Sequence, residues 1–120
     1  AFSWDNLHSA RFTDTNLKGA KFVGHPEKLR HERAGEAPKF TKTNMKGADF
    51  HHLDLTDVDF TGSNLEGANF DGARIICANM KGARLVNASF KRATFVGVKT
   101  EVADTTGCDW TDTILQRKLP

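Results

Sequence analysis

A large apolar residue returns at every fifth position of this chain, without a miss, from Phe40 to Phe95. These centres are Phe40, Met45, Phe50, Leu55, Phe60, Leu65, Phe70, Ile75, Met80, Leu85, Phe90 and Phe95. A small residue, most often alanine, stands two positions before most of them. A helix needs apolar residues near every 3.6 positions and a strand near every second position, so a period of five fits neither element. We therefore predict a repeat architecture.

The same period opens the chain and is interrupted once. Its first centres are Phe2, Leu7, Phe12, Leu17 and Phe22. Segment 23–37, which precedes the next centre, is charged, contains proline and glycine and has no period, as is typical of a loop. If Leu29 stands in for one missing centre, the loop adds eight residues to the repeat.

The period weakens near the C-terminal end and then recovers. Its centres there are Thr100, Thr105, Trp110 and Leu115. A length of 120 residues suits one small domain. We expect a single domain, 1–120, with a first repeat block at 1–22, a loop insertion at 23–37, a second repeat block at 38–115 and a tail at 116–120.

Glycine supports the five-residue unit independently. Nine of the ten glycines lie two residues after a centre. Glycine adopts a positive φ at low steric cost, so each unit is expected to be a short extended piece followed by a turn. The centre and the small residue should point inward and the other three residues should face solvent.

Several units carry a resemblance to a known family. Segments 63–67, 68–72 and 78–82 read Ser-Asn-Leu-Glu-Gly, Ala-Asn-Phe-Asp-Gly and Ala-Asn-Met-Lys-Gly, and segment 48–50 reads Ala-Asp-Phe. They resemble the motif of the pentapeptide-repeat proteins. The resemblance implies an all-β fold, a right-handed quadrilateral β-helix (a solenoid) of about five to six 20-residue coils with one loop insertion. It supplies no shared catalytic residues.

The distribution of charge supports a coil made of four such units. If coils stack like strands, outward residues 20 apart are neighbours, and opposite charges should pair there. From Lys39 onward the charged pairs at this separation are Lys39/Asp59, Lys46/Glu66, Asp54/Arg74, Asp71/Lys91, Lys81/Glu101, Arg84/Asp104 and Arg92/Asp112, all opposite in sign. A separation of 15 gives a mixed set. The same register predicts an aromatic core stack of Phe50, Phe70, Phe90 and Trp110, continued toward the N-terminus by Phe22 and Phe2.

Two groups of polar residues were weighed as ligand sites. His51 and His52 occupy outward positions, with Asp71 one coil from His51, so a surface metal site is conceivable, but no third close ligand is apparent and a solvated face is preferred. The loop offers a basic run for phosphate or an acidic partner, formed by Lys28, Arg30, His31 and Arg33. Three glutamates interleave with that run, which favours a solvated loop. We predict no metal site and no cofactor.

The cysteines and polar residues offer no catalytic arrangement. Cys108 occupies an inward small position and Cys77 an outward position of another face, so no disulfide is expected between them. The sequence contains no serine, histidine and acid constellation and no phosphate-binding glycine loop. We predict that the protein is not an enzyme and takes no small-molecule substrate.

An apolar strip is the strongest candidate for an interaction site. Ile76, Val96 and Ile114 are predicted to share one outward face, one coil apart, with Cys77 beside them. Contiguous apolar surface marks docking sites, whereas single exposed apolar residues are ordinary. We define the candidate docking face as Ile76, Cys77, Val96 and Ile114.

The preferred function is a structural or protein-interaction scaffold, such as an accessory subunit of a larger assembly, whose partner is a protein. The alternative comes from family members that mimic DNA and inhibit or protect type II topoisomerases. Those members are markedly acidic on at least one face, whereas this chain has a net charge of +2. The near balance of charge disfavours the mimic and also direct nucleic-acid binding.

Location is predicted from the resemblance. Several plant and cyanobacterial members occupy the thylakoid lumen, and the first residue is Ala1 rather than methionine, so we expect a removed targeting segment or a trimmed chain. A plastid thylakoid lumen is preferred and a bacterial cytoplasm is the alternative. No apolar run is long enough for membrane insertion. The family's end-to-end association makes a homodimer an open alternative.

Overall fold

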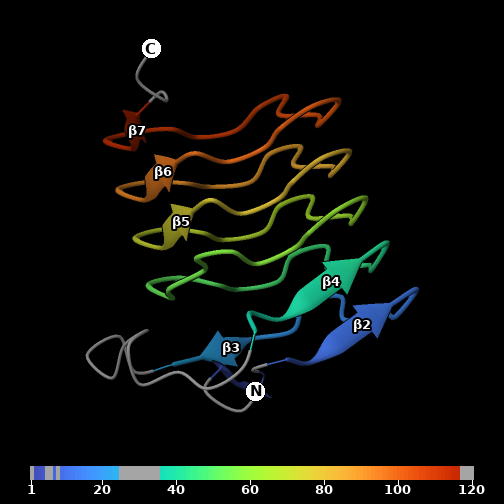
Figure 1. Ribbon diagram of the computed structural model, residues 1–120. Coiled ribbons are helices and arrows are strands. Elements are labelled where there is room, and N and C mark those ends of the chain that lie inside the picture. The colour runs from blue at the N-terminus through green and yellow to red at the C-terminus, as the bar shows by residue number, and fades with distance from the viewer. Residues whose placement is uncertain (1, 5–6, 8, 25–35, 117–120) are drawn as a thin grey trace.

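The computed structural model describes residues 2–4, 7, 9–24 and 36–116 (Figure 1). Within these ranges, seven short strands lie along a chain that winds in stacked circuits, with the first and the last strand toward opposite ends of the stack. We call each circuit a coil. The strands are β1 (Phe2–Ser3), β2 (Arg11–Thr13), β3 (Phe22–Val23), β4 (Lys39–Thr41), β5 (Arg74–Ile76), β6 (Thr94–Val96) and β7 (Ile114–Gln116). Strand β3 reaches Val23 and β7 reaches Gln116, each one residue beyond the expected end of its repeat block.

Parallel pairing sets the register between successive coils. Strands β5, β6 and β7 form one sheet in which Ile75 pairs with Phe95 and Phe95 with Leu115. Isolated bridges repeat the same separation elsewhere, for example between Asn44 and Asn64. The predicted 20-residue register is therefore confirmed by the observed pairing.

The insertion changes this register at one place. Strands β2 and β4 pair through Phe12 and Phe40, whose positions in the sequence differ by 28. Phe2 of β1 pairs with Phe22 of β3, and their positions differ by the usual 20. The predicted excess of eight residues is therefore confirmed. Leu29, which was expected to fill the missing centre, lies outside the described residues.

Two kinds of hydrogen bond explain why the five-residue motif folds this way. The centre donates its N–H to a carbonyl of the next coil, as Phe50 does to Asn69 over 2.7 Å. The residue before the centre bonds within its own turn: Asn69 Oδ1 accepts the N–H of Asp71 at 2.8 Å. Asn and Asp favour such turns because their short side chains reach the backbone two residues on. Gly72 then closes the unit with a φ of +70°.

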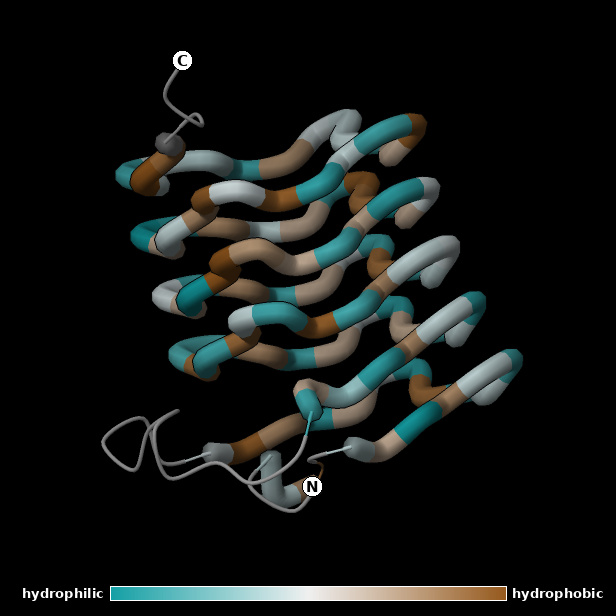
Figure 2. The backbone as a smooth tube through the Cα atoms, in the orientation of Figure 1, coloured by the Kyte–Doolittle hydropathy of each residue, from teal (hydrophilic) through white to brown (hydrophobic). Residues whose placement is uncertain are grey.

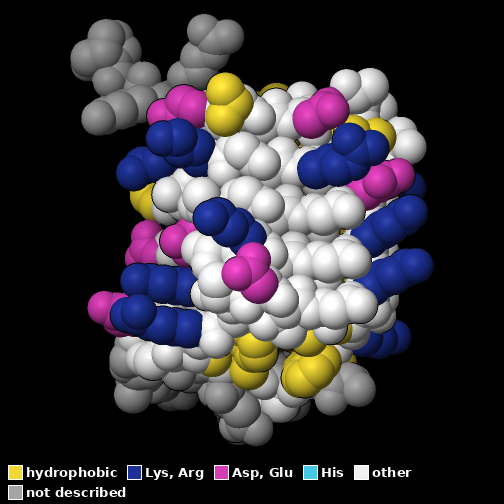
Figure 3. Space-filling model, turned by 90° about the vertical axis from the view of Figure 1, so that its right-hand side faces the viewer, with side chains coloured by type: hydrophobic (Ala, Val, Ile, Leu, Met, Phe, Trp, Pro, Cys, Tyr) yellow, Lys and Arg dark blue, Asp and Glu magenta, His cyan; other side chains and the backbone are white. Residues whose placement is uncertain are grey.

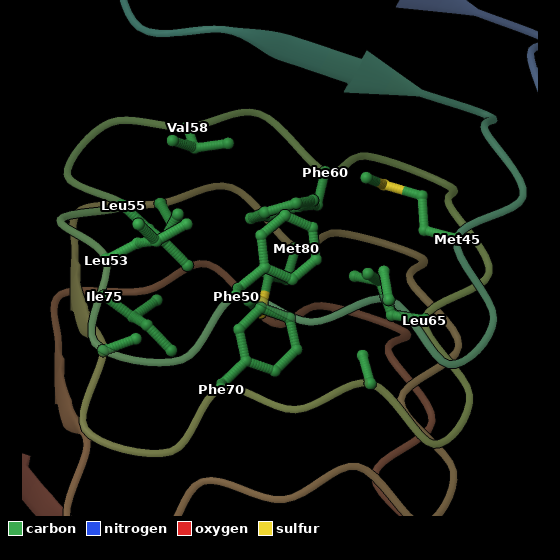
Figure 4. Packing of buried hydrophobic residues seen from close by; sticks show 14 of the residues in the cluster. Met45, Phe50, Leu53, Leu55, Val58, Phe60, Leu65, Phe70, Ile75 and Met80 are labelled. Carbon is green, nitrogen blue, oxygen red and sulfur yellow. The ribbon is translucent and has the colours of Figure 1, made fainter. Parts of the chain in front are cut away.

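The core is a column of stacked rings with aliphatic side chains around it. Phe50, Phe60 and Phe70 meet in the middle of the coil, with Leu55 and Ile75 on one side (Figure 4). The ring centroids are separated by 5.3 Å for Phe2–Phe22, 4.9 Å for Phe22–Phe50, 5.1 Å for Phe50–Phe70, 4.9 Å for Phe70–Phe90 and 4.5 Å for Phe90–Trp110. Apolar and polar residues alternate along each coil, so every coil adds to this core (Figure 2).

Trp4 closes the core near the insertion. It stands at a turn position, where solvent exposure was expected, yet only 6% of it is exposed. Its ring stacks on Phe40 at 6.1 Å, and its Nε1 donates to the carbonyl of Asp54 over 3.2 Å. Gly24 permits this packing, because a Cβ there would lie 2.8 Å from Leu53 Cδ2 and 3.3 Å from Trp4 Cβ.

The outward charges are mixed in sign (Figure 3). Three of the predicted charged pairs, Lys39/Asp59, Asp54/Arg74 and Arg84/Asp104, occupy directly paired positions of neighbouring coils. Among the described side chains, the close ion pairs join other partners. Arg84 contacts Glu66 at 3.3 Å rather than Asp104, and Lys91 meets Asp71 through its backbone N–H. Asp104 is already engaged by the N–H and hydroxyl of Thr106, and an exposed arginine gains little from one particular partner.

Across the described ranges, the chain forms no helix with the length and hydropathy of a membrane span.

Candidate functional site

The candidate docking face lies on the sheet of β5, β6 and β7. Ile76 follows the inward centre Ile75, Val96 follows Phe95, and the two outward residues pair directly across β5 and β6. Both are half-buried because neighbouring coils cover their flanks. They form a continuous apolar row on the outside of the stack.

Ile114 joins this face in a different row. It lies on β7, one coil from Val96 as predicted, but it pairs with Thr94 rather than with Val96. The cause is its position in the unit, because Ile114 precedes the centre Leu115 whereas Ile76 and Val96 follow their centres. Ile114 is 58% exposed and lies diagonally next to Val96 at the edge strand β7.

Cys77 extends the face around a turn. Its φ is +58°, and its side chain is exposed. A Cβ on Gly97, in the next coil, would lie 3.4 Å from Cys77 Sγ, so the thiol rests over the backbone of that glycine turn. Arg74 is the charged residue of the described part of this sheet. The face thus presents two apolar side chains in line, a third beside them and a thiol at the rim.

The second cysteine lies on the inside of the stack. Cys108 is half-buried, and its Sγ donates to the carbonyl of Leu85 at 3.0 Å. Burial raises the pKa of the Cys108 thiol, and the negative charge of Asp104 adds to this effect. A raised pKa keeps the thiol protonated and poorly nucleophilic. Both cysteines are free, so only Cys77 offers an accessible thiol.

His51 and His52 line a hollow beside the point where the insertion leaves the stack. The hollow has a volume of about 110 Å³ and is also lined by Phe22, Val23, Gly24 and Leu53. His51 Nδ1 lies 2.7 Å from Asp49 Oδ1. Partial burial acts to raise the pKa of Asp49, but hydrogen bonds from His51 and the charges of His51 and Lys21 outweigh it, so this pKa lies below its ordinary value.

The expected neighbour of His51, Asp71, is turned away from it. The Asp71 carboxylate accepts from the hydroxyl of Ser89 and from the N–H of Lys91. Among the described residues, no group of three or more His, Cys, Asp and Glu side chains is arranged to hold a metal ion. The basic run of Lys28, Arg30, His31 and Arg33 lies outside the described residues.

Sequence reasoning missed the Asp49–His51 contact and the hollow. A signal was present in the spacing, because an aspartate before a centre and a polar residue after it are two residues apart, as in the Asp54–Thr56 pair. The hollow itself depends on Gly24 lying below His52, and this pairing follows only once the shift in register at the insertion is known.

Comparison with known proteins identifies the repeat. The family model for pentapeptide repeats matches residues 39–62 and 54–92. The crystal structure of a pentapeptide repeat protein from the thylakoid lumen of Arabidopsis thaliana is 27% identical, with a TM-score of 0.64, over 92% of this chain and 68% of that one. No protein with a curated description matches at a significant level.

Two further solved structures are similar at lower scores. One is the pentapeptide repeat protein Rfr23 from the cyanobacterium Cyanothece 51142, 23% identical with a TM-score of 0.47, over 95% of this chain and 90% of that one. The other is trypsin-treated QnrB1, a plasmid-mediated fluoroquinolone resistance protein, 16% identical with a TM-score of 0.37, over 94% and 72%. Neither bears on the function of this chain. The matched repeats, the pairing of positions 20 apart and the column of inward rings agree, and residues 39–92 of the chain are pentapeptide repeats.

Proposed function

We propose that this chain is a non-enzymatic protein-interaction scaffold, of the kind that serves as an accessory subunit of a larger assembly. The observation that carries the proposal is the apolar row of Ile76 and Val96, extended by Ile114 and Cys77, on a sheet held rigid by the ring column behind it. Apolar side chains that lie next to one another at the surface favour docking of another protein. The likeness to a family without shared catalytic residues supports a role in binding rather than catalysis.

The alternative of a DNA mimic receives no support from the surface charge. The side drawn in Figure 3 has lysine and arginine among its aspartates and glutamates. Asp54 and Arg74 occupy neighbouring positions of one column, which interrupts the run of negative charge that a mimic of the phosphate backbone needs. Retention of a topoisomerase in the experiment below would reverse this preference.

We also propose the architecture of the domain and its cellular location. We infer one domain, 1–120, a right-handed quadrilateral β-helix of five to six coils with its insertion at 23–37, supported by the regular parallel pairing between coils. The likeness to a lumenal Arabidopsis protein supports a thylakoid lumen over a bacterial cytoplasm. The loop run of Lys28, Arg30, His31 and Arg33 is a second candidate contact, and a homodimer is an open alternative.

The experiment compares three variants in an affinity capture from an extract of the source organism. Val96→Glu places a charge in the apolar row, and Val86→Glu is the matched control, because Val86 also follows a centre and is half-buried on another face. Deletion of residues 25–35 tests the loop. We expect one retained protein to be lost with Val96→Glu and kept with Val86→Glu. Equal retention by all variants would refute the candidate docking face.

A further inference from the structure

The hollow beside the insertion holds a pair of imidazoles whose geometry suits a shared ligand. The centroids of the His51 and His52 rings lie 5.1 Å apart, and the rings are nearly perpendicular, at 77°. Two imidazoles that bind one tetrahedral ion through nitrogens about 2.0–2.1 Å from the metal have ring centres roughly 5 Å apart. The spacing of the two rings, which is also that of an ordinary edge-to-face contact, is compatible with a two-histidine metal site.

A carboxylate orients the first ring. His51 Nδ1 lies 2.7 Å from Asp49 Oδ1, and the side chains of His51 and Asp49 are 41% and 24% exposed. A carboxylate at Nδ1 holds the proton on that nitrogen and leaves the lone pair of Nε2 for a metal, and histidine ligands commonly have such a partner. His51 therefore has the kind of hydrogen-bonding partner that orients a metal-binding histidine, which the sequence did not reveal.

Two glycines set the position of the second ring. Nδ1 and Cε1 of His52 lie against the Gly72 turn, where an added Cβ would come within 2.5 Å of Nδ1 and 2.6 Å of Cε1. Since Nδ1 faces this turn, Nε2 is the nitrogen of His52 that remains for a ligand. Gly24 lines the other side of the hollow and contributes no side chain to fill it.

The hollow has room for a hydrated ion. Its volume of about 110 Å³ exceeds the roughly 10–15 Å³ that one water requires. In the part of the chain that the structure describes, no third His, Cys, Asp or Glu joins the two imidazoles. Imidazole nitrogen suits late first-row ions such as Zn²⁺ and Cu²⁺ better than it suits Mg²⁺ or Ca²⁺.

We propose that His51 and His52 bind one divalent transition-metal ion through their Nε2 atoms, with Asp49 as the positioning residue for His51. The site lies on a different side of the stack from the candidate docking face, because it follows the centre Phe50 whereas β5 to β7 surround the centres Ile75, Phe95 and Leu115. It is independent of the proposed scaffold function.

The test is a calorimetric titration of the full chain with Zn²⁺, read together with imidazole ¹⁵N NMR spectra. His51→Gln and His52→Gln should each weaken binding at least about tenfold, and Asp49→Asn about tenfold, because loss of an orienting carboxylate typically costs 10–100-fold in metal affinity. Asp71→Asn is the control, because that nearby carboxylate bonds Ser89 and Lys91 rather than a histidine, and it should leave the affinity within about twofold.

The spectra locate the metal as well as detect it. Binding should shift the Nε2 resonances of His51 and His52 and leave their Nδ1 resonances nearly unchanged. Absence of saturable binding up to about 1 mM Zn²⁺ would overturn the proposal. Undiminished affinity in the His51→Gln, His52→Gln double variant would also overturn it and would assign the metal to other histidines of the chain.

Discussion

Phe70→Ala tests whether the ring column holds the fold together. Phe70 is fully buried, with its ring stacked on Phe50 at 5.1 Å and on Phe90 at 4.9 Å, and with Phe60 edge-on at 6.0 Å. A buried Phe→Ala change costs about 3–5 kcal/mol through lost transfer energy and the cavity left behind. The coils above and below are fixed by backbone hydrogen bonds and cannot close the cavity. We therefore expect the free energy of unfolding to fall by about 4–5 kcal/mol, in the upper half of that range.

The assay is urea unfolding at 25 °C, followed by circular dichroism. Phe2→Ala is the control, because Phe2 ends the same column, is 40% exposed and, among the described rings, stacks on Phe22 alone. Removal of this half-exposed ring should cost about 1–2 kcal/mol. The reasoning is refuted if the two variants lose equal stability, or if Phe70→Ala loses less than about 1.5 kcal/mol.

Two other changes test the turns and the thiols. Val102→Gly should raise the free energy of unfolding by about 0.5–1 kcal/mol. Val102 has a φ of +51°, which is strained for a β-branched residue, and the strain energy that glycine removes exceeds the free-energy cost of the greater entropy that glycine gives the unfolded chain. A lower melting temperature for Val102→Gly would contradict this account. Under native conditions a maleimide should modify Cys77 at least about tenfold faster than Cys108, whose thiol is half-buried and has a raised pKa. Equal rates, measured by mass spectrometry of the labelled peptides, would show that Cys108 is not held inside the stack.

The sequence predicts most of the core because each inward residue of a stacked repeat meets its counterpart one coil away. The five-residue period therefore specifies the contacts of Phe50, Phe70 and Phe90 without knowledge of the rest of the chain. The eight-residue excess follows from the same reasoning, since the pairing must resume in phase after the loop. The repeat does not predict the position of Trp4. Trp4 stands at a turn position, yet it is buried against Phe22 and Phe40.

Contacts between outward-facing side chains are harder to predict, because these side chains are not fixed by packing in the core. Arg84 has Asp104 at the expected separation, yet it contacts Glu66, because Asp104 already accepts hydrogen bonds from its own turn. The candidate docking face shows the same limit. Its strand register was predictable, but the displacement of Ile114 into the row of Thr94 depends on its place within the repeat unit.

Photo-crosslinking from Cys77 tests the central claim, the docking of a protein on the candidate docking face, most directly. A crosslinker on Cys77, in a Cys108→Ser background, lies at the rim of that face, and the control carries it at Val86→Cys in a chain without other cysteines. We predict that, in an extract of the source organism, a single protein adduct forms from Cys77 and is lost when Val96→Glu is added, and that the control forms no such adduct. An identical adduct from the control position, or an adduct from Cys77 that survives Val96→Glu, would contradict the proposed docking face.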